Sequence, residues 1–246
     1  MKDVWLLWGF LALPIALGVA VCLWDSIGEH LALITWRPPA GLFAEDRDVD
    51  GEARDPAELR GTAYHEAAHF AVLYSLQPDA VREVTIIRSA HRLGAMFHTP
   101  FTPAQVDVAG VVFFAGCWGE VLSGVAQATA MRGAAGDFAN AVPVIEQFVA
   151  SRRRPGPVSM VPSSAPPMEQ AQGHYQAQAF LHVSNLWGSI EAIATALLRH
   201  RRLDREAAVE AFNIGKTMPS ADVRSRLVAG WRRSQAADER IARSRG

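Results

Sequence analysis

Cysteine is scarce in this chain, and neither sign of charge is in excess. The two cysteines are Cys22, in a long apolar segment, and Cys117, in a predicted helix, so we expect no disulfide between them. The 24 basic and 25 acidic residues give a net charge of −1. Proteins that bind nucleic acid usually carry a basic excess, so the composition gives no reason to expect such a partner.

A nucleotide-binding loop is also missing. Gly215-Lys216-Thr217 matches the end of the phosphate-loop motif, but the motif needs a glycine at position 210, where the chain has Glu210. We interpret these residues as the end of a helix. No nucleotide site is therefore expected in this polypeptide.

One long apolar run lies near the amino terminus. Val4–Trp24 contains no charged residue over 21 positions, which is long enough to cross a bilayer as a helix. Tryptophans mark its ends, as interfacial aromatic residues do: Trp5, Trp8 and Trp24. We expect residues 1–36 to form a single-pass membrane anchor and residues 37–54 to form a linker. A cleaved signal peptide is the alternative, which the length of the apolar run disfavours.

The segment His65-Glu66-Ala67-Ala68-His69 spells HExxH, the helix motif of zinc hydrolases. On a helix, positions 65 and 69 lie on one face, so both imidazoles can reach one metal ion. Glu66 is placed to accept a proton from a water molecule that the metal activates. The alternative is a solvated helix face that happens to carry two histidines.

A helix over residues 56–76 is predicted around this motif. Asp55 is suited to the N-cap, Pro56 to the first helical position, and Glu58 follows three residues after the cap. Apolar residues recur at helical spacing, and Pro78 ends the segment.

A catalytic zinc ion of this type needs a third protein ligand. The metzincin extension would place glycine at position 72 and histidine at 75, where the chain has Val72 and Ser75. The third ligand must therefore come from farther along the chain, and Asp137 and Glu120 are both candidates. Either carboxylate could instead cap a helix or lie on the surface.

From Tyr64 to about Ala141, the order and spacing of short blocks resemble the peptidase domain of the FtsH family of zinc metallopeptidases. The blocks and their family counterparts are YHEAAH at 64–69 (YHEAGH), VTIIR at 84–88 (VTIIPR), LG at 93–94 (LG), AGCWGEVL at 115–122 (AGRxAExL) and GAAGDF at 133–138 (GASNDL). The resemblance implies that His65 and His69 bind Zn²⁺ with Asp137 as third ligand, and that Glu66 is the general base. Glu120 would then support a ligand or pack against the site.

Ala68 and Cys117 are among the departures from the family pattern. Ala68 replaces a glycine, which adds a methyl group where a neighbouring element can pass closely, and Cys117 replaces an arginine. Neither position is an inferred ligand or base. FtsH enzymes also carry an AAA ATPase module in the same chain, and the roughly forty residues between the apolar run and Tyr64 are too few for one.

The remaining pattern predicts a mainly α-helical fold with a small β-hairpin or sheet, an α+β class built on a zincin-like HExxH helix. The expected elements are strands at 81–88 and 93–99, a buried helix at 106–123, a helical region at about 169–201 and a charged helical end. We place an FtsH-like peptidase domain at residues 55–246, with a flexible proline-rich loop at about 151–168.

Together these features predict a membrane-anchored zinc metalloendopeptidase that hydrolyses flexible or unfolded proteins without an ATPase of its own. The expected partners are protein or peptide substrates and the membrane, with a homo-oligomer or a separate ATPase also possible. The few basic residues that flank the apolar run, Lys2 and Arg37, weakly favour an external catalytic domain, whereas the family resemblance favours a cytoplasmic one, which we expect. The alternatives are a non-catalytic membrane adaptor or assembly factor that keeps a peptidase fold, and a zinc hydrolase that uses Glu120 as ligand.

Overall fold

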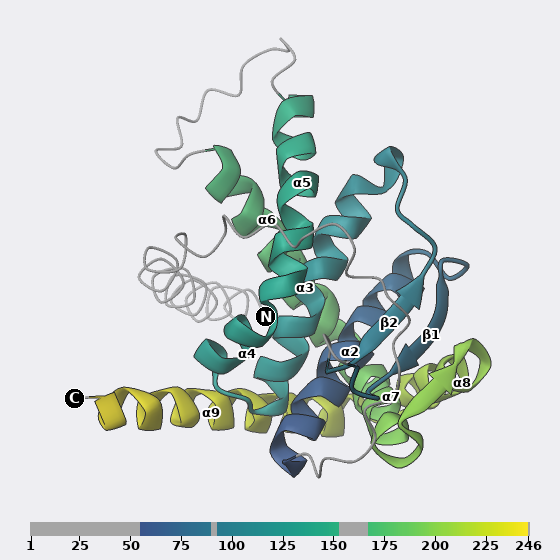
Figure 1. The fold of residues 1–246 in the computed structure, drawn as a ribbon. Helices are drawn as coiled ribbons and strands as arrows, with labels where there is room; N and C mark the ends of the chain where they lie inside the picture. Colours follow the sequence, from purple (N-terminus) through teal and green to yellow (C-terminus); the bar gives the residue numbers. More distant parts are fainter. Residues whose placement is uncertain (1–54, 90–92, 153–166, 246) are drawn as a thin grey trace, which may run out of the picture. The chain divides into compact units, whose positions relative to one another are not determined.

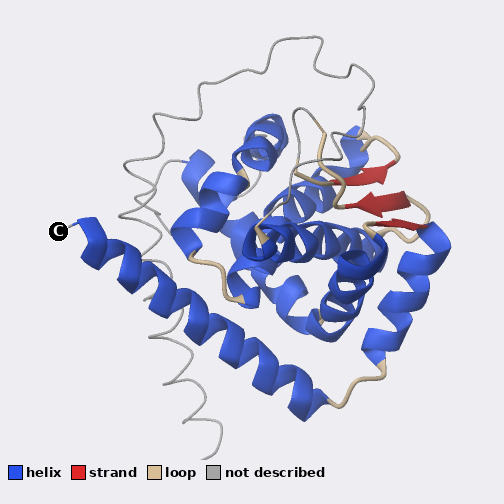
Figure 2. Cartoon of the chain, turned by 60° about the horizontal axis from the view of Figure 1, so that its bottom comes forward, coloured by secondary structure: helices blue, strands red, loops and turns tan. Residues whose placement is uncertain are grey.

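The computed structural model describes residues 55–89, 93–152 and 167–245. These residues are mostly helical and include a small three-stranded antiparallel sheet, as predicted (Figures 1 and 2). The expected anchor (1–36) and linker (37–54) lie outside the described residues, as do residues 153–166 of the expected loop. The two ends of that predicted loop are helical instead, because the flanking helices reach residues 152 and 167.

The elements have the following bounds. The helices are α2 (Pro56–Leu76), α3 (Val106–Ser123), α4 (Gln127–Gly133), α5 (Ala135–Arg152), α6 (Pro167–Asn185), α7 (Trp187–His200), α8 (Arg205–Lys216) and α9 (Ser220–Arg245), with a 3-10 turn η2 at Pro103–Gln105. The strands are β1 (Val81–Thr85), β2 (Ala95–His98) and β3 (Arg202–Asp204).

Helix α2 spans the residues that the sequence predicted. Asp55 caps it, because its Oδ1 accepts a hydrogen bond from the backbone N–H of Ala57 at 3.0 Å. The middle of α2 is buried, with Ala63, Phe70 and Leu73 fully inaccessible to solvent. It packs against α3 and α7, so the motif-bearing helix lies in the core.

Helix α3 matches the predicted buried helix and is strongly apolar. Among the described residues, Pro103–Ser123 is the one helical stretch long and apolar enough to cross a membrane, with a mean hydropathy of 1.5. Within its most apolar window, 72% is buried inside the protein by neighbours that include α2, α5, α6 and α9. Packing in the core accounts for this apolar character, as it does in soluble helical proteins.

Helices α2 and α3 cross closely at two small residues. A Cβ atom at Gly119 would lie 2.5 Å from the carbonyl oxygen of Tyr64 and 2.6 Å from the Cβ of Ala68. The methyl group of Ala68 is therefore accommodated by the missing side chain at position 119.

The sheet lies at one side of the helices, with strand order β2-β1-β3 (Figure 2). The predicted hairpin is present with shorter strands, and Val84 pairs with Met96 in its antiparallel register. Strand β1 also pairs with β3, which the sequence reading missed because three residues between two helices show no periodicity. Strand β2 is an edge strand that contacts α2.

The predicted helical region at 169–201 is two helices rather than one, with a break at Leu186. The break lets Trp187, which is buried, stack on Tyr64 of α2 at a ring separation of 5.4 Å. Helical hydrogen bonds are kept on both sides of the break, from Leu186 N–H to the His182 carbonyl and from Ile190 N–H to the Leu186 carbonyl. The predicted helix end at Gly215-Lys216-Thr217 is confirmed, because α8 stops at Lys216.

Candidate metal site

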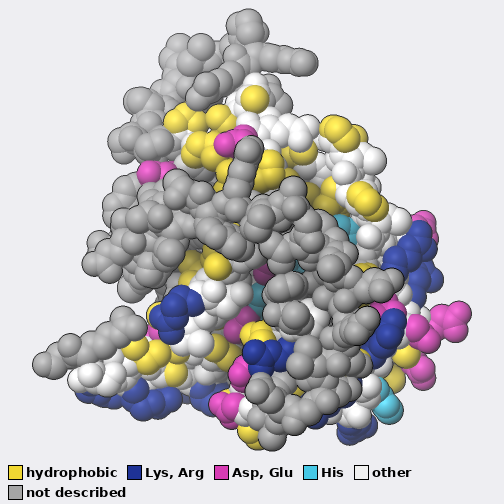
Figure 3. Space-filling view, in the orientation of Figure 1, with side chains coloured by type: hydrophobic (Ala, Val, Ile, Leu, Met, Phe, Trp, Pro, Cys, Tyr) yellow, Lys and Arg dark blue, Asp and Glu magenta, His cyan; other side chains and the backbone are white. Residues whose placement is uncertain are grey.

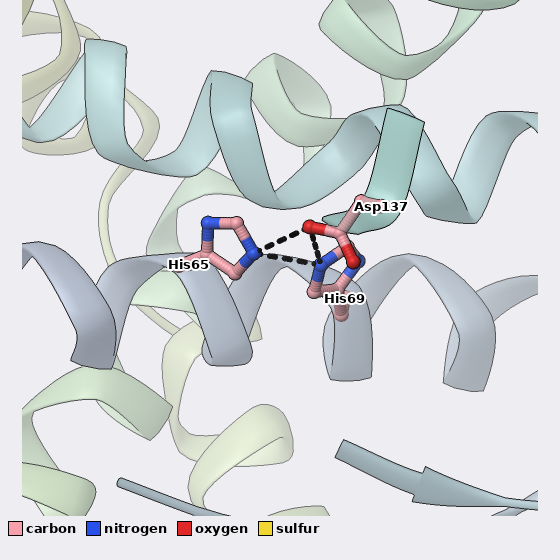
Figure 4. A group of neighbouring side chains, drawn as sticks. All are labelled: His65, His69 and Asp137. Carbon is pink, nitrogen blue, oxygen red and sulfur yellow. Dashed lines mark hydrogen bonds and ion pairs between the residues drawn. The ribbon is translucent and has the colours of Figure 1, made fainter. Parts of the chain in front are cut away.

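Two elements bring together three of the predicted site residues. His65 and His69 lie one turn apart on α2, and Asp137 reaches them from the first turn of α5 (Figure 4). Asp137 Oδ2 is 2.8 Å from His65 Nε2 and 3.3 Å from His69 Nε2, and the two Nε2 atoms are 3.0 Å apart. This largely buried group could hold a metal ion.

Hydrogen bonds on the opposite side of each ring fix which nitrogen faces this group. His69 Nδ1 lies 2.7 Å from the carbonyl oxygen of Val112, which can only accept, so Nδ1 carries the proton. His65 Nδ1 lies 2.6 Å from Glu120 Oε1, a carboxylate oxygen that accepts a hydrogen bond from it. With a metal ion bound and both rings neutral, each imidazole would direct an unprotonated Nε2 toward Asp137, as metal-binding histidines with such partners do.

Three lone pairs cannot face one another at these distances without a cation among them. A shared proton or a metal ion would satisfy them. Tetrahedral zinc with bonds of about 2.0–2.1 Å separates its ligand atoms by about 3.4 Å. The observed separations of 2.8, 3.0 and 3.3 Å require only a small outward movement of the side chains. The donor set, two imidazoles and one carboxylate, also suits zinc.

A glycine on α3 leaves space beside the donors. A Cβ atom at Gly116 would lie 2.5 Å from Nε2 of both His65 and His69. Any side chain there would displace the two imidazoles from their present positions. The absence of a side chain at Gly116 is thus a condition for this arrangement of the donors.

Glu120 lies on the other side of His65 from Asp137. Its Oε1 contacts Nδ1 of His65, so it orients the ring instead of approaching both Nε2 atoms. Gly61 and Gly133 lie beside its carboxylate, and Cβ atoms there would be 3.6 and 3.7 Å from its oxygens, an ordinary van der Waals separation. Of the two candidate third ligands, the structure brings Asp137 and not Glu120 to the facing nitrogens.

Glu66 is buried beside the histidines, and the chain that enters β2 passes close to it. A Cβ atom at Gly94, just before β2, would lie 2.9 Å from Oε1 of Glu66. Burial raises the pKa of the Glu66 carboxyl, an effect that the neighbouring His65 and His69 oppose. The carboxyl therefore holds a proton more readily than an exposed glutamate does.

The charges of the donors depend on one another. Burial lowers the pKa of His65, but hydrogen bonds to Asp137 and Glu120 outweigh it and raise that pKa well above its usual value. Burial raises the pKa of Asp137, and the two histidines more than reverse this, so its pKa is lowered overall. When no metal is bound, a proton on His65 therefore holds the group together.

Cys117 follows Gly116 but does not join the donors. Its Sγ lies 3.3 Å from the Sδ of Met131, and the side chain is buried. Burial raises the pKa of the thiol well above its usual value, with Glu120 and Asp137 adding to the effect. Cys117 thus packs as a neutral side chain at the position where the resembled pattern has an arginine.

No protein-family model matches this chain, and no curated protein matches it either. The case for a metal site therefore depends on the geometry of these side chains and on the sequence motif.

Replacing Gly116 by alanine should abolish tight metal binding, because the new methyl group would push both Nε2 atoms apart. Alanine favours the helix by about 1 kcal/mol over glycine, so α3 itself should not be weakened. We expect the zinc dissociation constant, measured by chelator competition, to rise at least about a hundredfold. Gly136→Ala is the matched control, since a Cβ atom there meets nothing within 4 Å. Equal zinc affinity in Gly116→Ala and Gly136→Ala would contradict this account.

Zinc affinity should rise with pH. Zinc must displace the proton that the raised pKa of His65 retains near neutral pH, whereas Asp137, with its lowered pKa, is already ionised. Affinity should increase by about tenfold per pH unit up to the pKa of His65 and level off above it. Calorimetry in buffers of different ionisation enthalpy should detect about one proton released per zinc ion near neutral pH. An affinity independent of pH in this range would contradict the charge assignment.

Proposed function

We propose that this protein is a zinc metalloendopeptidase that hydrolyses peptide bonds in flexible or unfolded chains. The observation that supports this most is the convergence of His65, His69 and Asp137 beside the buried carboxyl of Glu66. A hydrolytic metal site needs a group that holds a metal ion and a carboxyl that transfers a proton. His65, His69 and Asp137 would be the first, and Glu66 the second.

His65, His69 and Asp137 would hold the zinc ion, and Glu120 and the Val112 carbonyl would keep the two rings in place. Zinc bound there would supply a Lewis acid for the scissile carbonyl and lower the pKa of water. Glu66 would accept the proton of the attacking water and deliver it to the leaving amine. A carboxyl whose pKa is raised by burial is suited to both tasks, because it holds the proton between the two transfers.

The edge strand β2 supports an extended peptide as the substrate. Strand β2 contacts α2, and Gly94 at its start lies against Glu66. A peptide that adds to this edge would form backbone hydrogen bonds and pass beside the carboxyl. Leu93 and Phe97, both 41% exposed, offer apolar surface next to it. Strand addition needs an extended chain, which favours flexible or unfolded substrates over folded ones.

The resemblance to FtsH peptidases is part of this proposal, and two observations support it. The carboxylate that the resemblance assigns as third ligand is the one that lies beside both Nε2 atoms. The FtsH pattern has glycine at 68 and alanine at 119, whereas this chain has alanine at 68 and glycine at 119, and these two positions face each other at one helix crossing. We also propose a single-pass anchor at Val4–Trp24 and a cytoplasmic catalytic domain, which rest on the sequence and the resemblance. The proposal also includes one of two partners: a separate ATPase, which would supply unfolded substrate, or further copies of this chain in a homo-oligomer.

Glu66→Gln tests the catalytic assignment, because it removes the base and keeps the shape of the side chain. The full-length protein, purified in detergent with zinc, should cleave fluorescently labelled casein, an unstructured probe. The variant should bind zinc as tightly and lose at least about a hundredfold in cleavage rate. Glu58→Gln, an exposed position on the same helix, is the control and should keep full activity.

The other outcomes separate the alternatives. Equal cleavage by the wild type and Glu66→Gln would exclude Glu66 as the base. Zinc binding without any cleavage by the wild type would contradict the peptidase proposal and support the non-catalytic adaptor.

A further inference from the structure

The C-terminal helix α9 crosses the connection between α3 and α4. A side chain at Gly230 would collide with the carbonyl oxygen of Leu122, so the α9 backbone lies directly against the end of α3. Arg233 donates from Nη2 to the carbonyl oxygen of Ser123 at 3.3 Å. Its side chain also covers Gly124, which has a φ of +107°. Helix α9 therefore holds the turn that follows α3.

One carboxylate of α9 supplies the cap that α4 lacks in its own sequence. The N-cap position of α4 is Ala126, which has no side-chain acceptor. Asp238 accepts hydrogen bonds from the first two backbone N–H groups of the helix, Gln127 at 2.9 Å and Ala128 at 3.2 Å. A carboxylate at this end of a helix is favourable for its charge as well as for its hydrogen bonds.

Other charged side chains of α9 are more exposed than Asp238, among them Arg224, Arg232 and Arg243. Lys and Arg side chains gather along the lower edge of the molecule, where Figure 1 places α9 (Figure 3). Glu239, the neighbour of Asp238, is exposed, whereas Asp238 is half-buried against α4. Asp238 is thus the carboxylate of this pair that contacts the rest of the domain.

Helix α4 comes just before α5, the helix that carries Asp137. It has seven residues, too few to be stable without tertiary contacts. Ala134 alone separates it from α5, and the backbone N–H of Phe138 bonds to the carbonyl oxygen of Ala134. Asp137 is the third residue of α5, so the position of its carboxylate depends on where α4 ends.

We propose that Asp238 is a positioning residue for the metal site, which acts on Asp137 through α4. This inference rests on the proposed function only in that His65, His69 and Asp137 bind zinc. The capping bonds fix the start of α4, α4 fixes the start of α5, and Asp137 is thereby held within reach of both Nε2 atoms. The affinity of the site for zinc is then set partly by a helix about a hundred residues later in the chain.

The test measures zinc affinity of the full-length protein by chelator competition, with far-UV circular dichroism as a check on folding. Asp238→Ala should weaken zinc binding by about tenfold while the helical content is kept. Asp238→Asn retains one acceptor oxygen and should recover part of the affinity. Glu239→Ala, the adjacent exposed carboxylate, should bind zinc like the wild type.

The expected order of affinity is therefore wild type, then Asp238→Asn, then Asp238→Ala. Should Asp238→Ala unfold, reduced affinity in a folded Asp238→Asn protein supports the same conclusion. Wild-type affinity in both folded variants would overturn the proposal, as would a wild type that binds no zinc. Because zinc binding is measured apart from cleavage, a wild type that binds zinc and cleaves nothing would refute the peptidase activity alone.

Discussion

The imidazoles of His65 and His69 and the carboxylate of Asp137 point their electron-donating atoms toward one another. Much of the surrounding structure holds these three side chains in that arrangement. The Val112 carbonyl and Glu120 hold the Nδ1 protons of His69 and His65, which leaves both Nε2 atoms free to face Asp137. Such a group is stable only with a cation among its members. A cation bound here would contact donor atoms from the HExxH helix and from the start of α5, while α3 holds the two imidazoles in place.

Close approach of α2 and α3 is the structural condition for this site. The two helices can cross because Gly119 leaves room for Ala68, and the donors can converge because Gly116 has no side chain. The same apolar helix that forms the core thus forms one wall of the site and supplies both partners of the Nδ1 atoms, from Val112 and Glu120. The contact with α2 requires a glycine at 119, and the position of the donors requires one at 116.

Local signals predicted much of the fold. Asp55 and Pro56 marked the start of α2, and the apolar run at 106–123 matched α3 in full. Features that depend on distant contacts were missed. Strand β3 is too short to have a pattern of its own, and the stacking of Trp187 on Tyr64 joins residues far apart in the chain.

For the candidate site too, the features set by neighbouring residues were predictable from the sequence and those set by distant contacts were not. The helical spacing of His65 and His69 was readable from the sequence, whereas the residues alone left Asp137 and Glu120 equivalent. Only the fold shows that one carboxylate faces Nε2 and the other Nδ1 of the same ring. The cap that Asp238 provides for α4 joins residues 110 apart in the chain, so no sequence window could reveal it. The membrane anchor remains a prediction from Val4–Trp24.

X-ray absorption at the zinc edge of the zinc-loaded protein tests the central claim most directly, because it identifies the ligand atoms themselves. The account predicts one zinc ion per chain, with two imidazoles and oxygen ligands at about 2.0–2.2 Å in a shell of four or five. A sulfur ligand at about 2.3 Å, a shell of six oxygens, or the same spectrum from Asp137→Ala would contradict it.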